Sequence, residues 1–177
     1  MKRNKNSSAN CIIVLFTIAI VCVALLGIFN DLLYVPPDMS VFNKAASGTY
    51  TEKAVESVAL SYGKVEVAVD GTLDGGEKVV GLYVTGNKSG KADSFSLAVI
   101  VNTANNQIVG LYEITDGSTG GYEWDETKLS AAIGTDITSS DYVAMDGLVQ
   151  AGTTNSSSAV KNALMTAAEY YSKAIKG

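Results

Sequence analysis

Residues 64–69 read KVEVAV, and this short stretch decides the class of fold. Apolar and polar side chains alternate strictly along it, which is the pattern of a strand with one buried face. Strand-like segments recur at residues 78–85, 94–101 and 107–114, and polar turns rich in glycine or asparagine separate them. Strands joined by short turns pair in the antiparallel direction. The sequence therefore predicts an antiparallel sheet built from these segments.

Helical spacing appears on both sides of the predicted strands. Residues 51–62 place apolar side chains at helical intervals and stop at Gly63, so we expect a helix there. Asp125 is a candidate cap for a short helix that ends near Gly134. The clearest helix covers residues 157–175, whose apolar stripe consists of Val160, Leu164, Ala167, Tyr171 and Ile175. An antiparallel sheet with flanking helices makes the domain α+β.

The N-terminal region predicts a single membrane anchor. Residues 11–26 read CIIVLFTIAIVCVALL, and no charged residue lies between Lys5 and Asp31. A helix of about 20 residues rises roughly 30 Å, which matches the hydrocarbon core of a bilayer. Three cations precede the run and acidic residues follow it, so the positive-inside rule keeps the N-terminus in the cytoplasm.

This orientation divides the chain into four parts. Residues 1–10 are expected in the cytoplasm and residues 11–30 in the cell membrane as a transmembrane helix. Residues 31–48, which contain the only prolines, are expected to form a juxtamembrane linker. Residues 49–177 then form a small extracytoplasmic domain.

A cleaved signal peptide is the alternative for the N-terminal run. Such peptides have a shorter apolar core and end at a cleavage site of small residues. Residues 25–29 read LLGIF and contain no such site. A lipoprotein signal needs a small residue before its cysteine, but Asn10 precedes Cys11 and Val21 precedes Cys22. We therefore expect an uncleaved anchor.

Composition excludes several kinds of chemistry. The chain has no histidine, which removes Ser-His-Asp and Cys-His catalysis together with the commonest zinc ligand. Both cysteines lie inside the apolar run, so the domain has neither a disulfide nor a thiolate. A net charge of −5 argues against nucleic acid as a partner. We expect no catalytic residue and no metal site, so redox chemistry here would need a bound cofactor.

The candidate site precedes the last predicted helix. Residues 146–163 read DGLVQAGTTNSSSAVKNA. A glycine followed by hydroxyl residues at a helix N-terminus exposes backbone N–H groups that have no helical partner, and the helix dipole favours a phosphate there. The alternative is that residues 153–158 serve only as the N-cap of the helix.

Residues 151–164, AGTTNSSSAVKNAL, resemble the C-terminal signature of the FMN-binding domain family. That family includes the G subunit of Rnf electron-transport complexes and the C subunit of sodium-pumping NADH:quinone oxidoreductases. Its pattern is Ser/Thr-Gly-Ala-Thr, one variable residue and Ser/Thr, commonly followed by Ser-x-Ala-Val. Gly152 and Thr154 match this pattern, Asn155 takes the variable position, and Ser156 follows.

The resemblance has departures and further matches. Ala151 and Thr153 replace the usual Ser/Thr and Ala, and Asp146 lies two positions further upstream than the family's aspartate. Asn-Asp-Leu at residues 30–32 stands where family members often have Asn-Glu-Leu. Ser-Thr-Gly-Gly at residues 118–121 resembles the family's Glu-Thr-Pro-Gly turn; the matching residues are Thr119 and Gly121.

The resemblance implies covalent FMN, joined through its phosphate to Thr154 by a dedicated flavin transferase. It also implies that the signature residues and the glycine turn form the cofactor site, namely Gly152, Thr153, Asn155, Ser156, Thr119 and Gly121. Aromatic side chains available to contact the flavin ring are Tyr112, Tyr122 and Trp124. The expected function is that of an electron-carrier subunit of an Rnf/Nqr-type redox complex or extracytoplasmic electron-transfer chain, and not of a complete enzyme.

Two other functions are compatible with the sequence. The departures at Ala151, Thr153 and Asp146 allow a surface-anchored structural or binding domain that has lost the flavin. A pilin-like assembly subunit is the third possibility, although the apolar helix lacks the processing site and early glutamate of that class.

Overall fold

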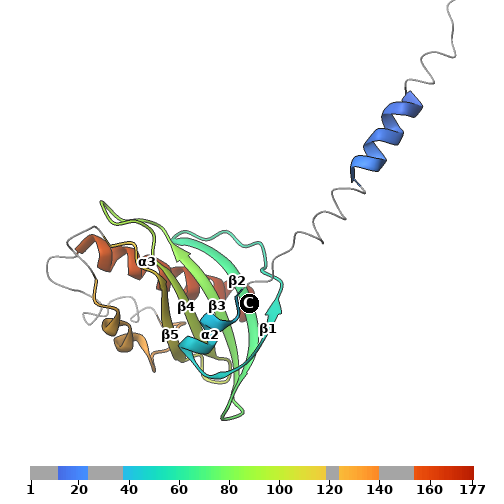
Figure 1. Cartoon of the computed structure of the whole chain (residues 1–177). Helices are drawn as coiled ribbons and strands as arrows, with labels where there is room; N and C mark the ends of the chain where they lie inside the picture. Colours follow the sequence, from blue (N-terminus) through green and yellow to red (C-terminus); the bar gives the residue numbers. More distant parts are fainter. Residues whose placement is uncertain (1–11, 24–37, 119–123, 140–153) are drawn as a thin grey trace, which may run out of the picture. The chain divides into compact units, whose positions relative to one another are not determined.

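The computed structural model describes residues 12–23, 38–118, 124–139 and 154–177, and the chain divides into two units, Met1–Pro37 and Asp38–Gly177 (Figure 1). In the first unit, residues 12–23 are helical. Within the described ranges, no helix is both long and apolar enough to cross a membrane. Residue 11 and residues 24–30 of the predicted anchor lie outside those ranges, so the anchor stays a prediction.

The second unit contains a five-stranded antiparallel sheet, which confirms the predicted α+β class. Each strand pairs with its neighbours along the chain, in the order β1-β2-β3-β4-β5. The strands are β1 (Gly48–Lys53), β2 (Gly63–Leu73), β3 (Lys78–Gly86), β4 (Ser96–Asn102) and β5 (Ile108–Thr115). The four predicted strands correspond to β2 through β5, and β1 is an additional edge strand.

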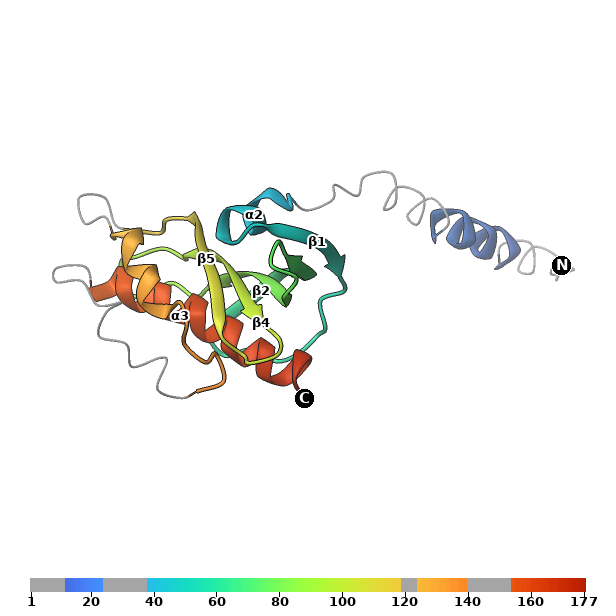
Figure 2. The same cartoon turned by 90° about the horizontal axis from the view of Figure 1, so that it is seen from below.

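Helices cover both faces of this sheet, as Figures 1 and 2 show. The helix α3 (Thr154–Tyr170) packs on one face, over apolar side chains such as Val80, Leu82 and Val84 of β3. The short helix α2 (Ser40–Ala45) packs on the other face. Because both faces of β4 are covered, all seven of its residues are buried.

The folded unit starts earlier than the sequence indicates. Residues 40–45, which the sequence assigns to the juxtamembrane linker, form α2 and place Phe42 in the smaller core. Gly81 of β3 makes this packing possible, because a Cβ there would lie 2.9 Å from the Phe42 ring and 2.6 Å from Val69. The two-unit division accordingly begins the domain at Asp38.

The helix predicted over residues 51–62 is wrong. Residues 51–53 belong to β1, and residues 54–62, here called the strap, have no helical structure. Three backbone groups of the strap form hydrogen bonds with side chains of α3 and of the segment after it. Tyr170 Oη accepts from Glu56 N–H at 2.9 Å, and Glu169 Oε2 accepts from Ser61 N–H at 2.7 Å. Lys173 Nζ donates to the Ala59 carbonyl at 2.8 Å. Long-range partners thus outweigh the local helical spacing.

The other two helical predictions are confirmed with shifted ends. Asp125 caps the 3₁₀ helix η1 (Glu126–Ala132), and hydrogen bonds from the Thr127 hydroxyl and backbone N–H lower the pKa of its carboxyl. The last helix begins three residues earlier than predicted and continues after Tyr170 as the π-helical turn η4 (Tyr171–Ile175). In the predicted apolar stripe, Val160, Leu164, Ala167 and Tyr171 are buried and Ile175 is partly buried.

Candidate functional site

The N-terminus of α3 presents the residue that the signature singles out. Thr154 is the first residue of the helix and is exposed, as is Asn155. The next two hydroxyl residues turn inward, since Ser156 and Ser157 are only 2 % and 3 % exposed. Ser158 donates its hydroxyl to the Thr154 carbonyl at 2.9 Å. The Thr154 side chain therefore lies at the surface on a helical turn that its neighbours hold in place.

The loop between β3 and β4 packs against this helix end. Gly90 has a φ of +59°, and a Cβ on it would lie 2.5 Å from Asn155 Oδ1, so the loop and the first turn of α3 are in direct contact. Asn162 Nδ2 donates to the Asn87 carbonyl at 2.8 Å. A Cβ on Gly86 would lie 2.3 Å from the Ala163 backbone nitrogen, so only glycine allows β3 and α3 to approach this closely.

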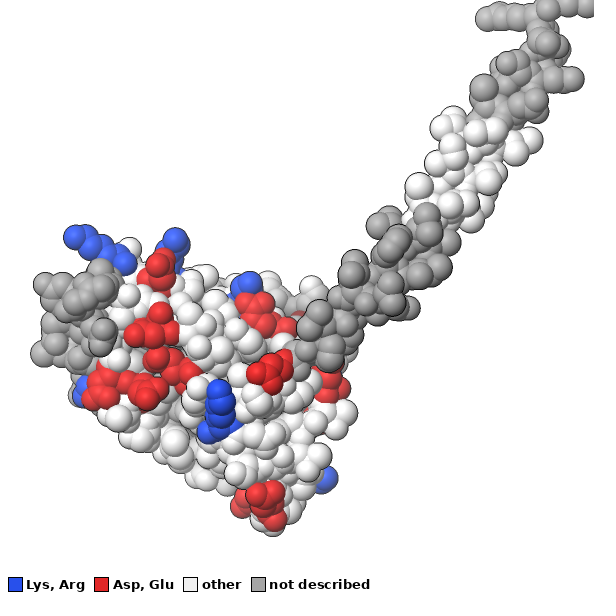
Figure 3. All heavy atoms as spheres, viewed as in Figure 1, with Lys and Arg blue, Asp and Glu red and all other residues white. Residues whose placement is uncertain are grey.

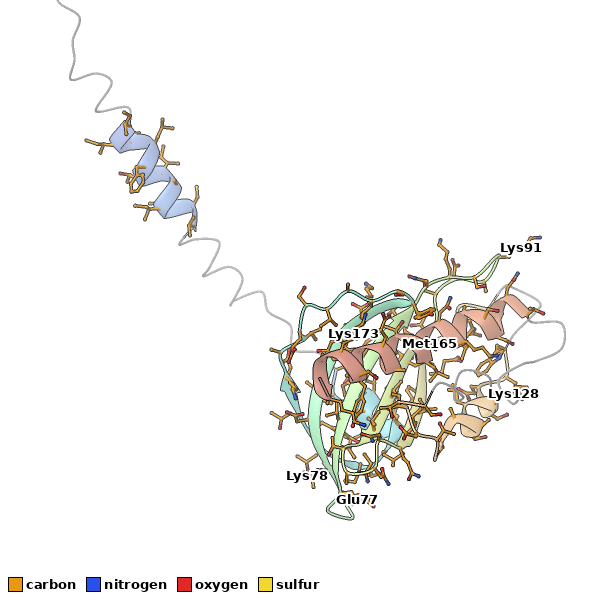
Figure 4. The ribbon with its side chains drawn as sticks, turned by 180° about the vertical axis from the view of Figure 1, so that it is seen from behind. Glu77, Lys78, Lys91, Lys128, Met165 and Lys173 are labelled. Carbon is orange, nitrogen blue, oxygen red and sulfur yellow. The ribbon has the colours of Figure 1, made fainter. Side chains whose placement is uncertain are left out.

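Charges near the first turn of α3 favour an anion. The turn contains no acidic residue. The adjacent loop carries Lys88 and Lys91, and the Lys88 ammonium lies 4.0 Å from Asp93 in a solvent-exposed pair. Figure 4 shows Lys91 and Lys173 toward opposite ends of α3, with Met165 between them. Lysines beside a helix N-terminus increase its attraction for a phosphate.

Trp124 lies in the larger core at the same end of the domain. Its ring packs edge-on against Phe95, with centroids 6.1 Å apart, and it is 5 % exposed. Its backbone N–H donates to Ser118 Oγ at 2.9 Å. The indole Nε1, in contrast, is buried and has no hydrogen-bond partner within the described part of the chain.

Glu113 is the second unusual polar group here. It follows Leu111 by two positions in β5, so its side chain projects from the face that α3 covers. Burial, followed by the nearby charges of Asp116 and Glu126, raises its pKa from 4.5 to about 7. Its Oε2 is buried and finds no hydrogen-bond partner among the described residues.

Glu113 and Trp124 both lie near the beginning of β4. Leu97 of β4 pairs directly with Glu113, and Phe95, which contacts Trp124, precedes Leu97 by two residues. Both Phe95 and Leu97 belong to the larger core. We call this region, made of Glu113, Trp124, Phe95 and Ser118, the buried corner.

The structure describes only some of the site residues that the sequence predicts. It places Thr154, Asn155 and Ser156 together on the first turn of α3. Gly152, Thr153, Thr119 and Gly121 lie outside the described residues, as does Tyr122.

The predicted aromatic contacts for the ring do not share one surface. Tyr112 packs on the α2 face of the sheet, where Lys44 lies 5.0 Å from its ring centroid, whereas Trp124 belongs to the α3 face. Tyr112 and Trp124 therefore cannot contact opposite sides of one ligand. Sequence reasoning missed Glu113, although an acidic residue at an inward position of an alternating strand was an available signal.

Away from this end, one pocket is open and hydroxyl-rich. It has a volume of about 360 Å³ and lies on the sheet, lined by Thr49, Thr51, Asp70, Gly71, Thr72, Lys78, Val79 and Thr103. Both charged side chains of its lining already have partners: Asp70 pairs with Lys53 at 3.3 Å, and Lys78 Nζ donates to the Thr72 hydroxyl at 2.8 Å. Figure 4 shows Glu77 and Lys78 together at the end of the sheet away from Lys91. In the described ranges, no three side chains are placed to hold a metal ion.

Comparisons with family models, with curated proteins and with solved structures give no match to this chain. The resemblance to the FMN-binding domain family therefore rests on the residues quoted from the sequence.

Proposed function

We propose that this chain is a membrane-anchored electron-transfer subunit that carries FMN covalently on Thr154. Its N-terminus lies in the cytoplasm and its domain outside, within an Rnf/Nqr-type complex or an extracytoplasmic electron-transfer chain. The observation that carries the proposal is the position of Thr154: an exposed hydroxyl on the first turn of a helix, at the residue that the signature singles out. Other subunits of the redox complex and a flavin transferase are its expected partners.

The residues present fit a phosphoester at this position. The exposed Thr154 hydroxyl is accessible to a modifying enzyme, the first turn of α3 has no competing carboxylate, and the neighbouring loop carries Lys88 and Lys91. A negative charge within the first turn of a helix gains about 0.3–1 kcal/mol. Asn155 and Ser156 lie beside the attachment point, and Gly152, Thr153, Thr119 and Gly121 complete the proposed site.

The flavin, when bound, supplies the electron-transfer chemistry, and the protein holds and orients it. A covalent link suits a domain outside the cytoplasm, because a cofactor that dissociates there is lost by diffusion. The proposed role of this chain is therefore to present the flavin at one face of the membrane.

The test is in-gel fluorescence of the full chain produced together with a flavin transferase. We expect a fluorescent band after denaturation, since only a covalent flavin survives it. Thr154→Val should abolish the band, and Ser158→Ala, a matched loss of a hydroxyl on the same helix, should keep it. A band that persists in Thr154→Val contradicts the assignment of Thr154.

A second candidate is a structural or binding domain that has lost the flavin. The burial of Trp124 favours it, since no face of this ring is open to a ligand in the described structure. It predicts a colourless protein and no fluorescent band.

A further inference from the structure

The two edges of the sheet differ in how they are covered. On the outer side of β5, the Ile108 N–H donates to the Thr135 carbonyl at 2.9 Å, and the Ile108 carbonyl accepts from Gly134 N–H at 2.7 Å. At the other edge, which Figures 1 and 2 show, no strand of the described part of the chain lies beyond β1. Figure 3 shows acidic and basic side chains scattered over one face of the molecule. An uncovered edge strand is a template for pairing with another chain.

Hydrogen bonds at the start of β1 show which backbone groups face the open side. The groups of an antiparallel strand point alternately toward and away from a given neighbour. The Ser47 carbonyl accepts from Asp74 N–H, just beyond the end of β2, at 3.3 Å, whereas Gly48 N–H donates to Asn43 Oδ1 at 3.2 Å. The odd-numbered residues of β1 therefore bond to β2, and Tyr50 turns its N–H and C=O toward the open side.

The middle of β1 has no guard against such pairing. Natural edge strands are protected by proline, by bulges or by charged side chains, lysine above all. The strand β1 contains no proline, and its register with β2 runs without a bulge. Its one lysine, Lys53, is turned to its own sheet, where the ammonium lies 3.3 Å from Asp70 of β2. Residues 49–51 therefore present an unprotected edge.

The same three residues are symmetric in sequence, since Thr-Tyr-Thr reads alike in both directions. Two antiparallel copies of β1 with Tyr50 opposite Tyr50 place Thr49 of each copy opposite Thr51 of the other. Threonine pairs directly opposite each other stabilise a sheet. In this register Glu52 faces Gly48, whereas a register centred on Glu52 would set two carboxylates opposite each other.

The side chains of β1 suit such a contact on both faces of the sheet. Thr49 and Thr51 are exposed and belong to the hydroxyl-rich lining of the open pocket. On the other face, the Tyr50 ring packs against Phe42, with centroids 5.7 Å apart, and its hydroxyl donates to the Ala46 carbonyl at 2.6 Å. A second copy would add hydroxyls beside hydroxyls and a held aromatic ring beside another.

We propose that β1 pairs with β1 of a second copy of this chain, about a two-fold axis at Tyr50. The two five-stranded sheets then form one sheet of ten strands, and the same residues contribute from both sides, as in an isologous interface. Six residues from each copy are far fewer than the roughly 20–30 of a stable interface. We therefore expect a reversible dimer, which a covalent trap will capture.

The test is disulfide trapping between two kinds of full-length copy, in both of which Cys11 and Cys22 are replaced by alanine. One kind carries Thr49→Cys and the other Thr51→Cys. The Cα atoms of these opposite positions should lie about 4.5 Å apart, which a disulfide can join. Mild oxidation of the mixture should give a linked dimer on a non-reducing gel. Either kind alone should not, because its two sulfur-bearing positions are diagonal and about 7–8 Å apart.

A charge exchange tests the second threonine pair of the same dimer. Adding Thr51→Lys to the Thr49→Cys copy and Thr49→Lys to the Thr51→Cys copy sets two lysines opposite each other, so the linked dimer should fall several-fold. Replacing the first of these changes by Thr51→Glu makes the pair complementary and should restore it. All these substitutions change exposed side chains, so the fold is kept.

Three results would overturn the proposal. The first is no linked dimer in the mixture. The second is a linked dimer in Thr51→Cys copies alone, which would centre the contact on Thr51. The third is linkage of Thr51→Cys copies to copies carrying Thr115→Cys, at the exposed end of β5, which would indicate a head-to-tail contact of β1 with β5. The flavin takes no part in this contact, so none of these results bears on the attachment at Thr154.

Discussion

The two ends of α3 differ in how completely the polar groups beside them are hydrogen-bonded. Toward its C-terminus, Tyr170 and Glu169, together with Lys173 of η4, form hydrogen bonds with the strap. Toward its N-terminus lie the buried corner, with its two unpaired atoms, and the exposed Thr154. The first arrangement is typical of a structural contact that is complete by itself. Departures from complete hydrogen bonding, as at the second, concentrate at functional sites.

The largest expected effect comes from the middle of α3, on which both ends depend. Leu164 is buried in the larger core, and Leu164→Ala should destabilise the domain by about 3 kcal/mol through lost burial and the cavity that remains. Chemical denaturation measures the change. Met165→Ala, at the next and only partly buried position, is the control and should cost clearly less. Equal losses would show that α3 does not pack on the sheet through the predicted stripe.

An intermediate effect is expected at the C-terminal end. Tyr170→Phe removes the hydroxyl that accepts from Glu56 N–H and leaves that donor unpaired, so the free energy of unfolding should fall by about 1.5 kcal/mol. Hydrogen exchange at the Glu56 amide should accelerate. Tyr62→Phe, which changes an exposed tyrosine of the same strap, should have little effect on either measurement. An unchanged exchange rate in Tyr170→Phe would mean that the strap is held by other contacts.

The smallest effect is expected at the buried corner, where the substitution should raise the free energy of unfolding instead of lowering it. The folded chain holds the Glu113 proton more tightly than the unfolded chain, since its pKa rises from 4.5 to about 7. The wild type therefore loses stability as the pH rises from about 4.5 to about 7, and the loss then stays constant.

Glu113→Gln removes this loss, so at pH 8 the unloaded variant should be more stable than the wild type by about 1 kcal/mol, a value reduced for the partial exposure of the carboxyl. At pH 4 the two should unfold alike. Denaturation curves at both pH values provide the measurement. A variant that is less stable than the wild type at pH 8 would show that the carboxylate has a stabilising partner.

The sequence pattern was sufficient to predict those elements in which the spacing of apolar residues matches the face that is buried. The alternation in residues 64–69 identified β2, and the stripe that includes Val160 and Leu164 identified α3. The strap was misread because its helical spacing is coincidental. Its Val58 and Leu60 pack on the core from an extended backbone, and Val55 is 42 % exposed. No local pattern reveals that Tyr170, far along the chain, accepts a hydrogen bond from Glu56.

The same limit applies to the candidate site. The run of hydroxyl residues after a glycine placed the N-terminus of α3 to within three residues, because signals at a helix start are local in the sequence. The buried corner depends on the pairing of β4 with β5 and on the contact between Phe95 and Trp124. These contacts join residues that are far apart in the sequence, so only the folded structure reveals them.

The order of the strands also determines when the site forms. At most nine residues separate consecutive strands, as at residues 54–62 and 87–95, so the sheet can assemble from local pairings as the chain emerges. The helix α3 follows all five strands, and until it docks, one apolar face of the sheet remains exposed to water and to other chains. The residue proposed to carry the flavin begins this last helix. A transferase that requires the docked helix would therefore modify only chains that have completed folding, and flavin loading would report how much of the domain is folded.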